Sequence, residues 1–431
     1  METQMQPQPK TSIFQSSTAK MIMVGILTLV LLIPLTLVQD LITERSQRQK
    51  EVISETTSKW GNSVYFYGPI LKIPYKDPTT GINNYAYFFP DNLNSKSEVT
   101  MVKPLERSIY KSNVFATTMQ FDGTYSLLDF SSKGIPAENI FWNRAKIMIR
   151  TTNLKSLKDE VKMKIGNQNL AFESVANSAN DSIESLETNY FDYKLMENKA
   201  AFKFDISFNG SNQIKMVPVG KTTSASMTSN WNSPNFNGNF SPTSREINDK
   251  GFTANWKILH FNRPFSQHYF NVLPELSKYA FAVNFITPVD EYQQNERASK
   301  YGFLVIGLTF LIFFLIQSIS KINIHIFQYS MIGIALIMFY SLLISITEHS
   351  SFSFAYAIAA SSVIVLISLY AISILKDKKF PLFIGVSLTV LYTFIFVIIQ
   401  LEDYALLVGS IGLFLILAAV MYFSRKIEWN K

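Results

Sequence analysis

The sequence has 431 residues, of which 48% are hydrophobic and 16% charged, with no cysteine and a formal net charge of +7. A large domain without cysteine cannot depend on disulfides, so its own core must hold it together. The basic balance does not indicate nucleic-acid binding, because the lysines are scattered and form no run interleaved with aromatic residues.

The amino-terminal region predicts a polar tail followed by a membrane anchor. Residues 1–20 are mostly polar and typical of a disordered tail. Residues 21–39 contain an apolar run that is long enough to span a bilayer as a helix. This run is longer than a usual signal-peptide core, and no small-residue cleavage site follows it. We therefore expect an anchor that is not cleaved.

Residues 40–300 predict a large β-rich domain. Residues 41–60 have a high charge density and no Gly or Pro, which predicts a helix continuing the anchor. Beyond them, apolar and polar residues alternate with a period of two, as in antiparallel strands with one buried face. We expect strands at residues 64–75, 84–89, 201–208, 213–219 and 281–287.

Three other segments of this domain predict different structure. Residues 137–150 and 267–279 predict short helices. Residues 174–189 contain few apolar side chains, and we expect a surface loop there.

Residues 301–423 divide into five apolar blocks, at residues 301–320, 327–346, 352–375, 380–400 and 404–423. At about 1.5 Å per residue, each block covers the roughly 30 Å hydrocarbon core as a helix. The alternative would be helices buried inside a soluble protein. Five consecutive helices that are apolar on every side would leave that protein no polar face for water, so we exclude this alternative. We predict a polytopic α-helical membrane protein of six spans, with a large extracytoplasmic, mainly-β (α+β) domain inserted between spans 1 and 2.

The loop charges predict the orientation. If the amino terminus is cytoplasmic, all Lys and Arg of the tails and short loops lie inside, at Lys10, Lys20, Lys321, Lys376, Lys378, Lys379, Arg425, Lys426 and Lys431. The two short outer loops carry none. By the positive-inside rule, both termini, including the tail at residues 424–431, are expected in the cytoplasm of a bacterium, and residues 40–300 in the periplasm.

Several short motifs resemble the CreD family of bacterial inner-membrane proteins. In the β-rich domain these are Ser58 to Trp60, Gly68 to Tyr75, Ser229 to Pro242 and Gly251 to Trp256. In the spans they are Gln328 and Tyr329, Phe339 and Tyr340, Glu348 and His349, Ala355 and Tyr356, Gln400 to Tyr404, and Met421 and Tyr422. The resemblance runs from Met21 to Trp429. It implies a role in cell-envelope integrity and in envelope stress responses under a two-component system, and it transfers no catalytic residue.

Two sets of residues are candidates for binding. Trp60, Trp231 and Trp256, with nearby prolines, could line an aromatic groove for a peptide or a glycan, or could be core and corner residues of the β fold.

The second set lies in the expected outer loops and consists of Glu348, His349, Glu402 and Asp403. Three carboxylates and an imidazole could bind a divalent cation, sense pH or face a basic partner. Acidic residues also occur in outer loops simply because these loops are solvated.

The sequence favours a function without catalysis. It contains no H-E-x-x-H, G-x-S-x-G or phosphate-binding Gly-Lys motif, so we expect neither an enzyme nor a bound metal or cofactor. The spans contain almost nothing that titrates, which disfavours proton-coupled transport. Small residues at Gly409 and Gly412 predict close helix packing.

The expected partners are the lipid bilayer and an envelope protein or a cell-wall component, and no nucleic acid. The alternative is a channel or transporter accessory that moves a lipid or a small solute through the helix block.

Overall fold

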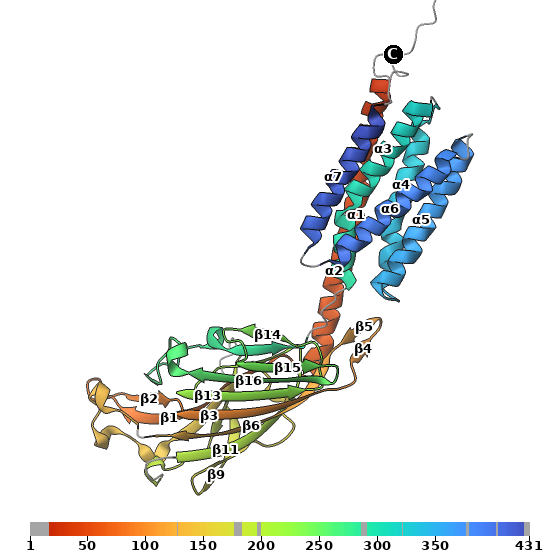
Figure 1. Ribbon diagram of the computed structural model, residues 1–431. Coiled ribbons are helices and arrows are strands. Elements are labelled where there is room, and N and C mark those ends of the chain that lie inside the picture. The colour runs from red at the N-terminus through yellow and green to blue at the C-terminus, as the bar shows by residue number, and fades with distance from the viewer. Residues whose placement is uncertain are drawn as a thin grey trace, which may run out of the picture. The chain divides into compact units, whose positions relative to one another are not determined.

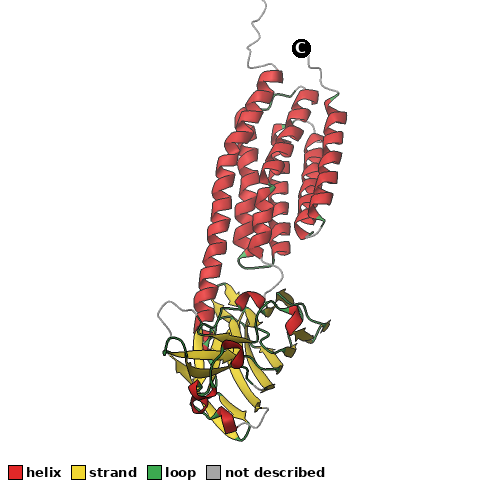
Figure 2. Ribbon diagram, turned by 90° about the vertical axis from the view of Figure 1, so that its left-hand side faces the viewer, coloured by secondary structure: helices red, strands yellow, loops and turns green. Residues whose placement is uncertain are grey.

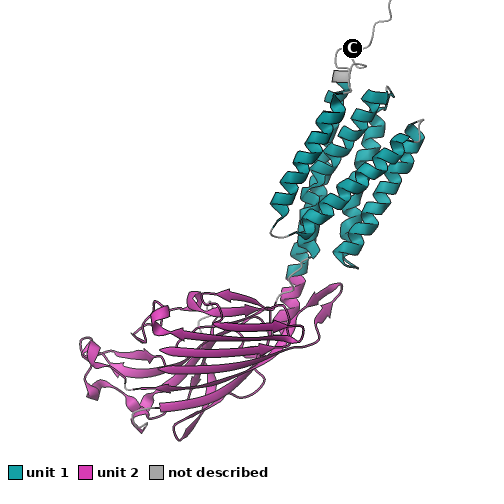
Figure 3. Cartoon of the chain, viewed as in Figure 1, with its two compact units in different colours: residues 1–50, 289–431 teal, residues 51–288 magenta. Residues whose placement is uncertain are grey.

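The computed structural model describes residues 17–126, 128–175, 183–195, 200–285, 291–320, 322–375, 379–401 and 404–425. The chain forms two compact units (Figure 3). One is β-rich and comprises residues 51–288, and the other is helical and comprises residues 1–50 and 289–431. Helix α1 (Ser17–Trp60) contributes residues to both units.

Among the described residues, six helices are long and apolar enough to span a membrane. They are α1, α3 (Gly302–Ser320), α4 (Ile326–Thr347), α5 (Phe352–Ile374), α6 (Lys379–Gln400) and α7 (Ala405–Ser424), which Figure 1 labels. Their bounds agree closely with the predicted apolar blocks. The prediction of six spans with a β-rich domain between the first and the second is confirmed.

Close contacts hold α1 against the other helices of its unit. Any side chain at Gly333 of α4 would collide with Leu31, and one at Gly302 of α3 would press on Leu35. Both leucines are buried. Glycine at these two positions therefore lets α1 approach α3 and α4 closely.

The interior of the helical unit is aromatic and neutral. The ring of Phe339 lies 5.2 Å from that of Tyr356 and 4.7 Å from that of Tyr392. The Tyr356 hydroxyl donates to the carbonyl oxygen of Tyr392 at 2.8 Å, and the Tyr329 hydroxyl donates to Gln317 Oε1 at 3.0 Å. The hydroxyl groups of Tyr356 and Tyr329 thus find partners inside the bundle, as a lipid environment favours.

A short helix, α2 (Glu291–Lys300), precedes α3 in the same unit. It contacts α3, α4, α5 and α6 through one face, on which Tyr292, Asn295, Ala298 and Ser299 are buried. These contacts join α2 to the spanning helices, in the unit that contains residues 289–431.

The β-rich unit contains a 16-stranded sheet (Figures 1 and 2). Its main path runs β14-β18-β12-β1-β7-β10-β9-β8-β11-β6-β3-β13-β16-β15, and β2 pairs with both β1 and β17. Most pairs are antiparallel, while β1 with β12 and β3 with β13 are parallel. The first strands are β1 (Val64–Lys76), β2 (Asn83–Phe88), β3 (Asn92–Met101), β6 (Val114–Tyr125), β7 (Lys146–Thr151), β8 (Lys162–Ile165) and β9 (Gln168–Val175).

The later strands complete the sheet and include the remaining expected ones. They are β10 (Glu184–Thr188), β11 (Ala200–Ser211), β12 (Gln213–Met216), β13 (Thr222–Ser229), β14 (Asn235–Gly238), β15 (Ser244–Asn248), β16 (Gly251–Leu259), β17 (His268–Phe270) and β18 (Phe281–Asn284). A separate hairpin joins β4 (Leu105–Arg107) to β5 (Tyr110–Ser112).

Alternation of side chains builds the core of this unit. Strands β6 and β11 pair along their whole length and bury nearly every second residue. From these strands Phe121 and Phe204 stack at 4.9 Å, and Phe66 of β1 stacks on Phe121 at 4.3 Å. Because β1 is remote from β6 along the sheet, the sheet must fold over so that its apolar face is buried against itself.

Three local predictions in this unit are wrong. Residues 137–150 form two 3₁₀ turns and part of β7 rather than a helix, and residues 267–279 form β17 and another 3₁₀ turn. Part of the expected loop at 174–189 is strand β10, while residues 176–182 lie outside the described part of the chain. Pairing with remote strands overrides the weak local preferences of these segments.

Candidate functional site

A polar cluster, here called the rim, lies at the α2 end of the helical unit. It consists of Gln39, Arg45, Tyr292, Gln294, Ser299, Glu348, Ser353 and Gln400. The residues come from α1, α2, the ends of α4 and α6 and the start of α5. A short loop joins Glu348 to Ser353, whereas packing of helices that are distant in the chain brings the other members together.

Glu348 is the acidic residue of the rim. Its Oε1 accepts a hydrogen bond from the Tyr292 hydroxyl at 3.4 Å and lies 3.7 Å from an Arg45 guanidinium nitrogen. The Glu348 side chain is 16% exposed, whereas that of Arg45 is 49% exposed. The carboxylate is therefore neutralised by a residue of its own chain, although Arg45 stays accessible to solvent.

Amide side chains complete the rim. Gln39 donates to the carbonyl oxygen of Ser299 at 3.0 Å, which ties α1 to α2. Gln294 donates to Gln400 Oε1 at 3.5 Å, and Gln400 donates to Ser353 Oγ at 3.3 Å. These bonds link α2 to α6 and α6 to α5, so the rim fastens the helix ends to one another.

The acidic candidates predicted from sequence are only partly placed. Glu348 joins the rim, and His349 is exposed beside it. Glu402 and Asp403 lie outside the described residues. Within the described part of the chain, no group of three or more His, Asp or Glu side chains is arranged to hold a metal ion.

The three tryptophans donate their indole N–H groups to different carbonyls. Trp256 is 2% exposed, stacks on Phe281 at 4.8 Å and donates to the Phe240 oxygen at 3.2 Å. Trp231 is half-buried and donates to the Ser233 oxygen at 2.8 Å. Trp60 donates to the Phe115 oxygen at 3.3 Å. The indoles are thus engaged by the fold, and Trp256 belongs to the core.

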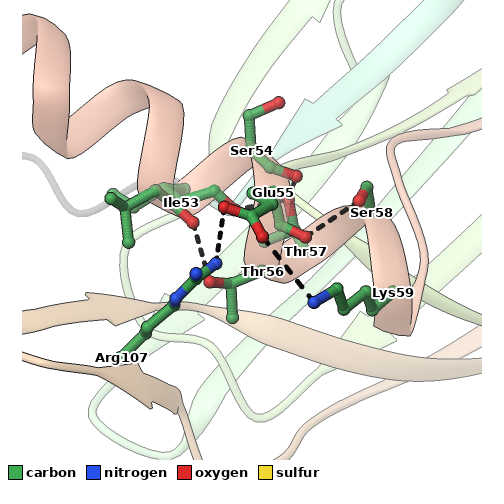
Figure 4. A network of polar contacts seen from close by, with 9 residues as sticks. Ile53, Ser54, Glu55, Thr56, Thr57, Ser58, Lys59 and Arg107 are labelled. Atoms are coloured by element: carbon green, nitrogen blue, oxygen red, sulfur yellow. Dashed lines mark hydrogen bonds and ion pairs between the residues drawn. The ribbon is translucent and has the colours of Figure 1, made fainter.

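A network of polar contacts around Glu55 joins the last turns of α1 to the β4–β5 hairpin of the β-rich unit (Figure 4). Arg107 of the β4–β5 hairpin makes an ion pair of 2.6 Å with Glu55, and Lys59 lies 3.7 Å from the same carboxylate. A side chain at Gly61 would collide with the carbonyl oxygen of Asn209 in β11. Glycine therefore lets the chain leave the helix directly against the sheet.

A surface hollow of about 400 Å³ lies where β3, β13, β15 and β16 run side by side. We call it the β13–β16 hollow. Its polar side chains include Glu98, Thr228, Asn230, Glu246 and Lys250, and Gly251 and Phe252 also line it. Both charge signs and several hydroxyl or amide groups suit a polar ligand such as a glycan or a peptide segment.

Gly251 shapes this hollow. Its φ is +137°, a conformation that side chains disfavour, and a Cβ there would collide with the carbonyl oxygen of Ser229. The hollow cannot be recognised from the sequence alone. Its only local signal was that Asn230 and Gly251 fall in two of the recognised motifs.

A buried charge cluster lies elsewhere on the sheet. The carboxylate of Glu187 on β10 lies 2.6 Å from Lys72 Nζ of β1 and 3.1 Å from Lys146 Nζ of β7. Burial acts to raise the pKa of Glu187, but the hydrogen bonds and charges of the two lysines outweigh it and hold that pKa below its ordinary value. The carboxylate stays ionised and cross-links three strands.

The whole chain matches one family of membrane proteins. The family model described as "Inner membrane protein CreD" matches residues 16–430. The chain belongs to the CreD family. The predicted resemblance to this family is therefore confirmed.

A curated relative in the CreD family supports the same assignment. Inner membrane protein CreD of Escherichia coli (strain K12) is 26% identical over 417 residues, which cover 93% of this chain and 91% of the relative. As a CreD-family member with six apolar helices, the chain is a multi-pass inner-membrane protein that contacts the lipid bilayer.

Solved structures resemble the CreD chain only distantly. A crystallised protein of Legionella pneumophila shares 8% identity at a TM-score of 0.25, covering 57% of this chain and 80% of that one. An M1 zinc metallopeptidase from Deinococcus radiodurans shares 8% identity at a TM-score of 0.20, covering 50% of this chain and 53% of that one. Scores this low do not establish a shared fold.

Proposed function

We propose that this CreD protein maintains cell-envelope integrity as a non-enzymatic, membrane-anchored binding protein. In this proposal both termini are cytoplasmic and the β-rich unit lies in the periplasm. The distribution of Lys and Arg in the short loops supports this orientation. The unit binds a polar envelope component, either a cell-wall glycan or peptide or a segment of an envelope protein.

The β13–β16 hollow is the observation that carries this proposal. It collects opposite charges and uncharged hydrogen-bonding groups from four strands, which is the lining expected for a polar ligand. The end of α1 adds support, because its ion pair between Glu55 and Arg107 joins the helix that leads from the first span to the β-rich unit.

The packed interior of the helical unit disfavours the alternative of a solute channel. Phe339, Tyr356 and Tyr392 fill the space between α4, α5 and α6 with ring contacts. Flux of a fluorescent solute or lipid from liposomes that contain the protein would test this alternative directly. Flux that depends on the protein would support transport and contradict a purely binding role.

Binding by the hollow can be tested with the full-length protein in nanodiscs. We expect purified cell-wall sacculi, or soluble fragments from them, to bind the native protein, and the Glu246→Ala/Lys250→Ala variant to bind at least about tenfold more weakly, because charge-assisted hydrogen bonds are lost. Lys164→Ala changes an exposed lysine of β8 and is the matched control. In cells that lack the native gene, only the control variant is expected to restore resistance to detergent.

Equal binding by the double variant and the control would contradict a role for the hollow. Cross-linking in intact cells would then decide whether the partner of the β-rich unit is a protein. Recovery of neither a cell-wall component nor an envelope protein would overturn the proposed function.

A further inference from the structure

An apolar cleft of about 790 Å³ lies between α3, α6 and α7 in the helical unit. We call it the α6–α7 cleft. Its walls come from residues within 308–319 of α3, 379–394 of α6 and 412–423 of α7, and nearly all of them are Leu, Ile, Val, Phe or Ala. Its volume falls in the range of about 300–1,000 Å³ typical of sites for small ligands.

The cleft follows the three helices over several turns. Residues 308–319 of α3 and 412–423 of α7 each span about 16 Å, and residues 379–394 of α6 span about 22 Å, at about 1.5 Å per residue. One leaflet of the hydrocarbon core is about 15 Å deep, half of roughly 30 Å. The walls from α3 and α7 therefore match the depth of a single leaflet, and the longer wall from α6 is still shorter than the whole hydrocarbon core.

The two ends of the cleft differ in chemistry. At the end of the cleft nearer the middle of the helices, Gly412 faces the ring of Phe394 so closely that any side chain on Gly412 would collide with it. At the opposite end, near the helix termini, Lys379 is part of the lining, and Arg425 follows shortly after Phe423, which also lines the cleft. The guanidinium of Arg425 lies 4.1 Å from the Tyr422 ring centroid. The apolar α6–α7 cleft thus ends beside cationic side chains.

The exposure of α7 leaves the α6–α7 cleft accessible to lipid. Every residue of α7 from Ala405 to Ser424 is at least partly exposed, and Phe383 and Phe423 meet across the cleft at 6.2 Å. Walls that are almost entirely apolar disfavour water, whereas an acyl chain of the surrounding bilayer meets the same apolar environment there as among other lipid tails.

We propose that the α6–α7 cleft holds an acyl chain of an anionic phospholipid from the bilayer, with the lipid phosphate at Lys379. The apolar lining accepts the chain, its depth matches one leaflet, and a cation at the headgroup level selects an anionic lipid over a zwitterionic one. This site lies in the helical unit and does not depend on the binding proposed for the β-rich unit.

The test uses the full-length protein in nanodiscs with phosphatidylglycerol that carries a photoreactive group near the end of one acyl chain. After illumination and digestion, mass spectrometry locates the labelled peptides. We expect labelling concentrated at Val390, Phe394 and Gly412. Val390→Trp and Ala419→Trp each fill the cleft from one wall, and we expect either to lower this labelling by at least about fivefold.

Val397→Trp is the matched control, because Val397 is an exposed α6 residue outside the cleft lining. It adds the same volume and is expected to leave the labelling unchanged. Equal thermal stability of the three variants would separate filling of the cleft from misfolding. If both cleft variants were labelled as strongly as the control, the proposal would be overturned.

The headgroup selectivity is measured separately by native mass spectrometry with phosphatidylglycerol and phosphatidylcholine in competition. Lys379→Gln is expected to lower the preference for phosphatidylglycerol by about fivefold, the effect of one cation near the membrane surface. An unchanged preference would contradict the assigned phosphate position. Dimers cross-linked through α7, together with absent lipid labelling, would mean that a second copy covers the cleft and would also overturn the proposal.

Discussion

Arg45 and Glu348 face each other at 3.7 Å in the rim, although one belongs to the first helix of the chain and the other follows α4. The pair is supported by the Tyr292 hydroxyl from α2, which donates to the same carboxylate oxygen. Three helices that are distant in sequence are therefore held at one acidic group. This contact gives the rim a structural role that can be tested by reversing its charges.

Arg45→Glu places two carboxylates next to each other, and we expect it to lower the melting temperature of the protein in nanodiscs. The loss should be modest, about 1 kcal/mol or less, because Arg45 is half exposed and solvent screens the pair. The double variant Arg45→Glu/Glu348→Arg restores opposite charges and should recover most of that loss. A double variant less stable than either single variant would contradict a direct pairing.

Glu187→Gln should lower the stability of the protein much more than Arg45→Glu does. The substitution leaves Lys72 and Lys146 without their shared carboxylate in a mostly buried place. We expect a loss of about 3 kcal/mol in the free energy of unfolding. Glu160→Gln removes a carboxylate from the exposed Glu160–Lys162 pair and should have little effect. Chemical denaturation of the three proteins side by side would measure the difference.

The same carboxylate makes stability depend on pH. The pKa of Glu187 is lower in the folded protein than the ordinary value of 4.5, so the folded state binds fewer protons near that pH. Its contribution is complete above about pH 4.5 and is lost as the pH falls through the lowered pKa. The stability difference between the native protein and Glu187→Gln should therefore shrink at acidic pH, and a difference that grew there would refute the assignment.

Gly251→Ala is expected to destabilise the β-rich unit through both strain and collision. The positive φ alone costs about 1–3 kcal/mol, and the new methyl group would press on the Ser229 carbonyl oxygen. Gly81→Ala is the control for strain alone, because Gly81 also has a positive φ but has open space around its Cβ position. In urea unfolding, the free energy of unfolding should be clearly lower for Gly251→Ala than for Gly81→Ala. The reverse order would be inconsistent with the close contact at Gly251.

Trp256→Ala should cost about 3–5 kcal/mol, as expected for a large aromatic side chain removed from a core. Trp231→Ala is expected to cost less, because Trp231 is only half-buried. These values separate the two roles that the sequence allowed for the tryptophans. A Trp256→Ala protein with native stability but lost ligand binding would restore the aromatic groove as the explanation.

The membrane spans could be predicted because their signal is local. An apolar run long enough to cross a bilayer, such as residues 380–400, leaves few alternatives whatever surrounds it. Strand β11 was similarly clear, because its alternating Phe and Ile residues have one buried face. Strand β7 was missed because it lies between β1 and β10, so several consecutive residues are buried and the period of two is lost.

The candidate sites depended on contacts that sequence spacing does not encode. Glu348 was recognisable as a polar loop residue, but Arg45 is one of several charged residues on α1, and only the packing of α1 against α4 selects it. Glu187 likewise lay in a segment expected to be a loop. Glu187 is buried because strand pairing brings β1 and β7 beside β10. The same pairing places Lys72 and Lys146, which are far from Glu187 in sequence, next to its carboxylate.

The neutral interior of the helical unit has an electrical consequence. A membrane potential does work only when charge moves through it, about 2.3 kcal/mol per elementary charge for every 100 mV. Tyr329 with Gln317 and Tyr356 with the Tyr392 carbonyl are uncharged pairs, so rearranging them carries no gating charge. Depolarisation of the cell should leave these helices undisturbed, and the protein would hold the same conformation in energised and de-energised membranes.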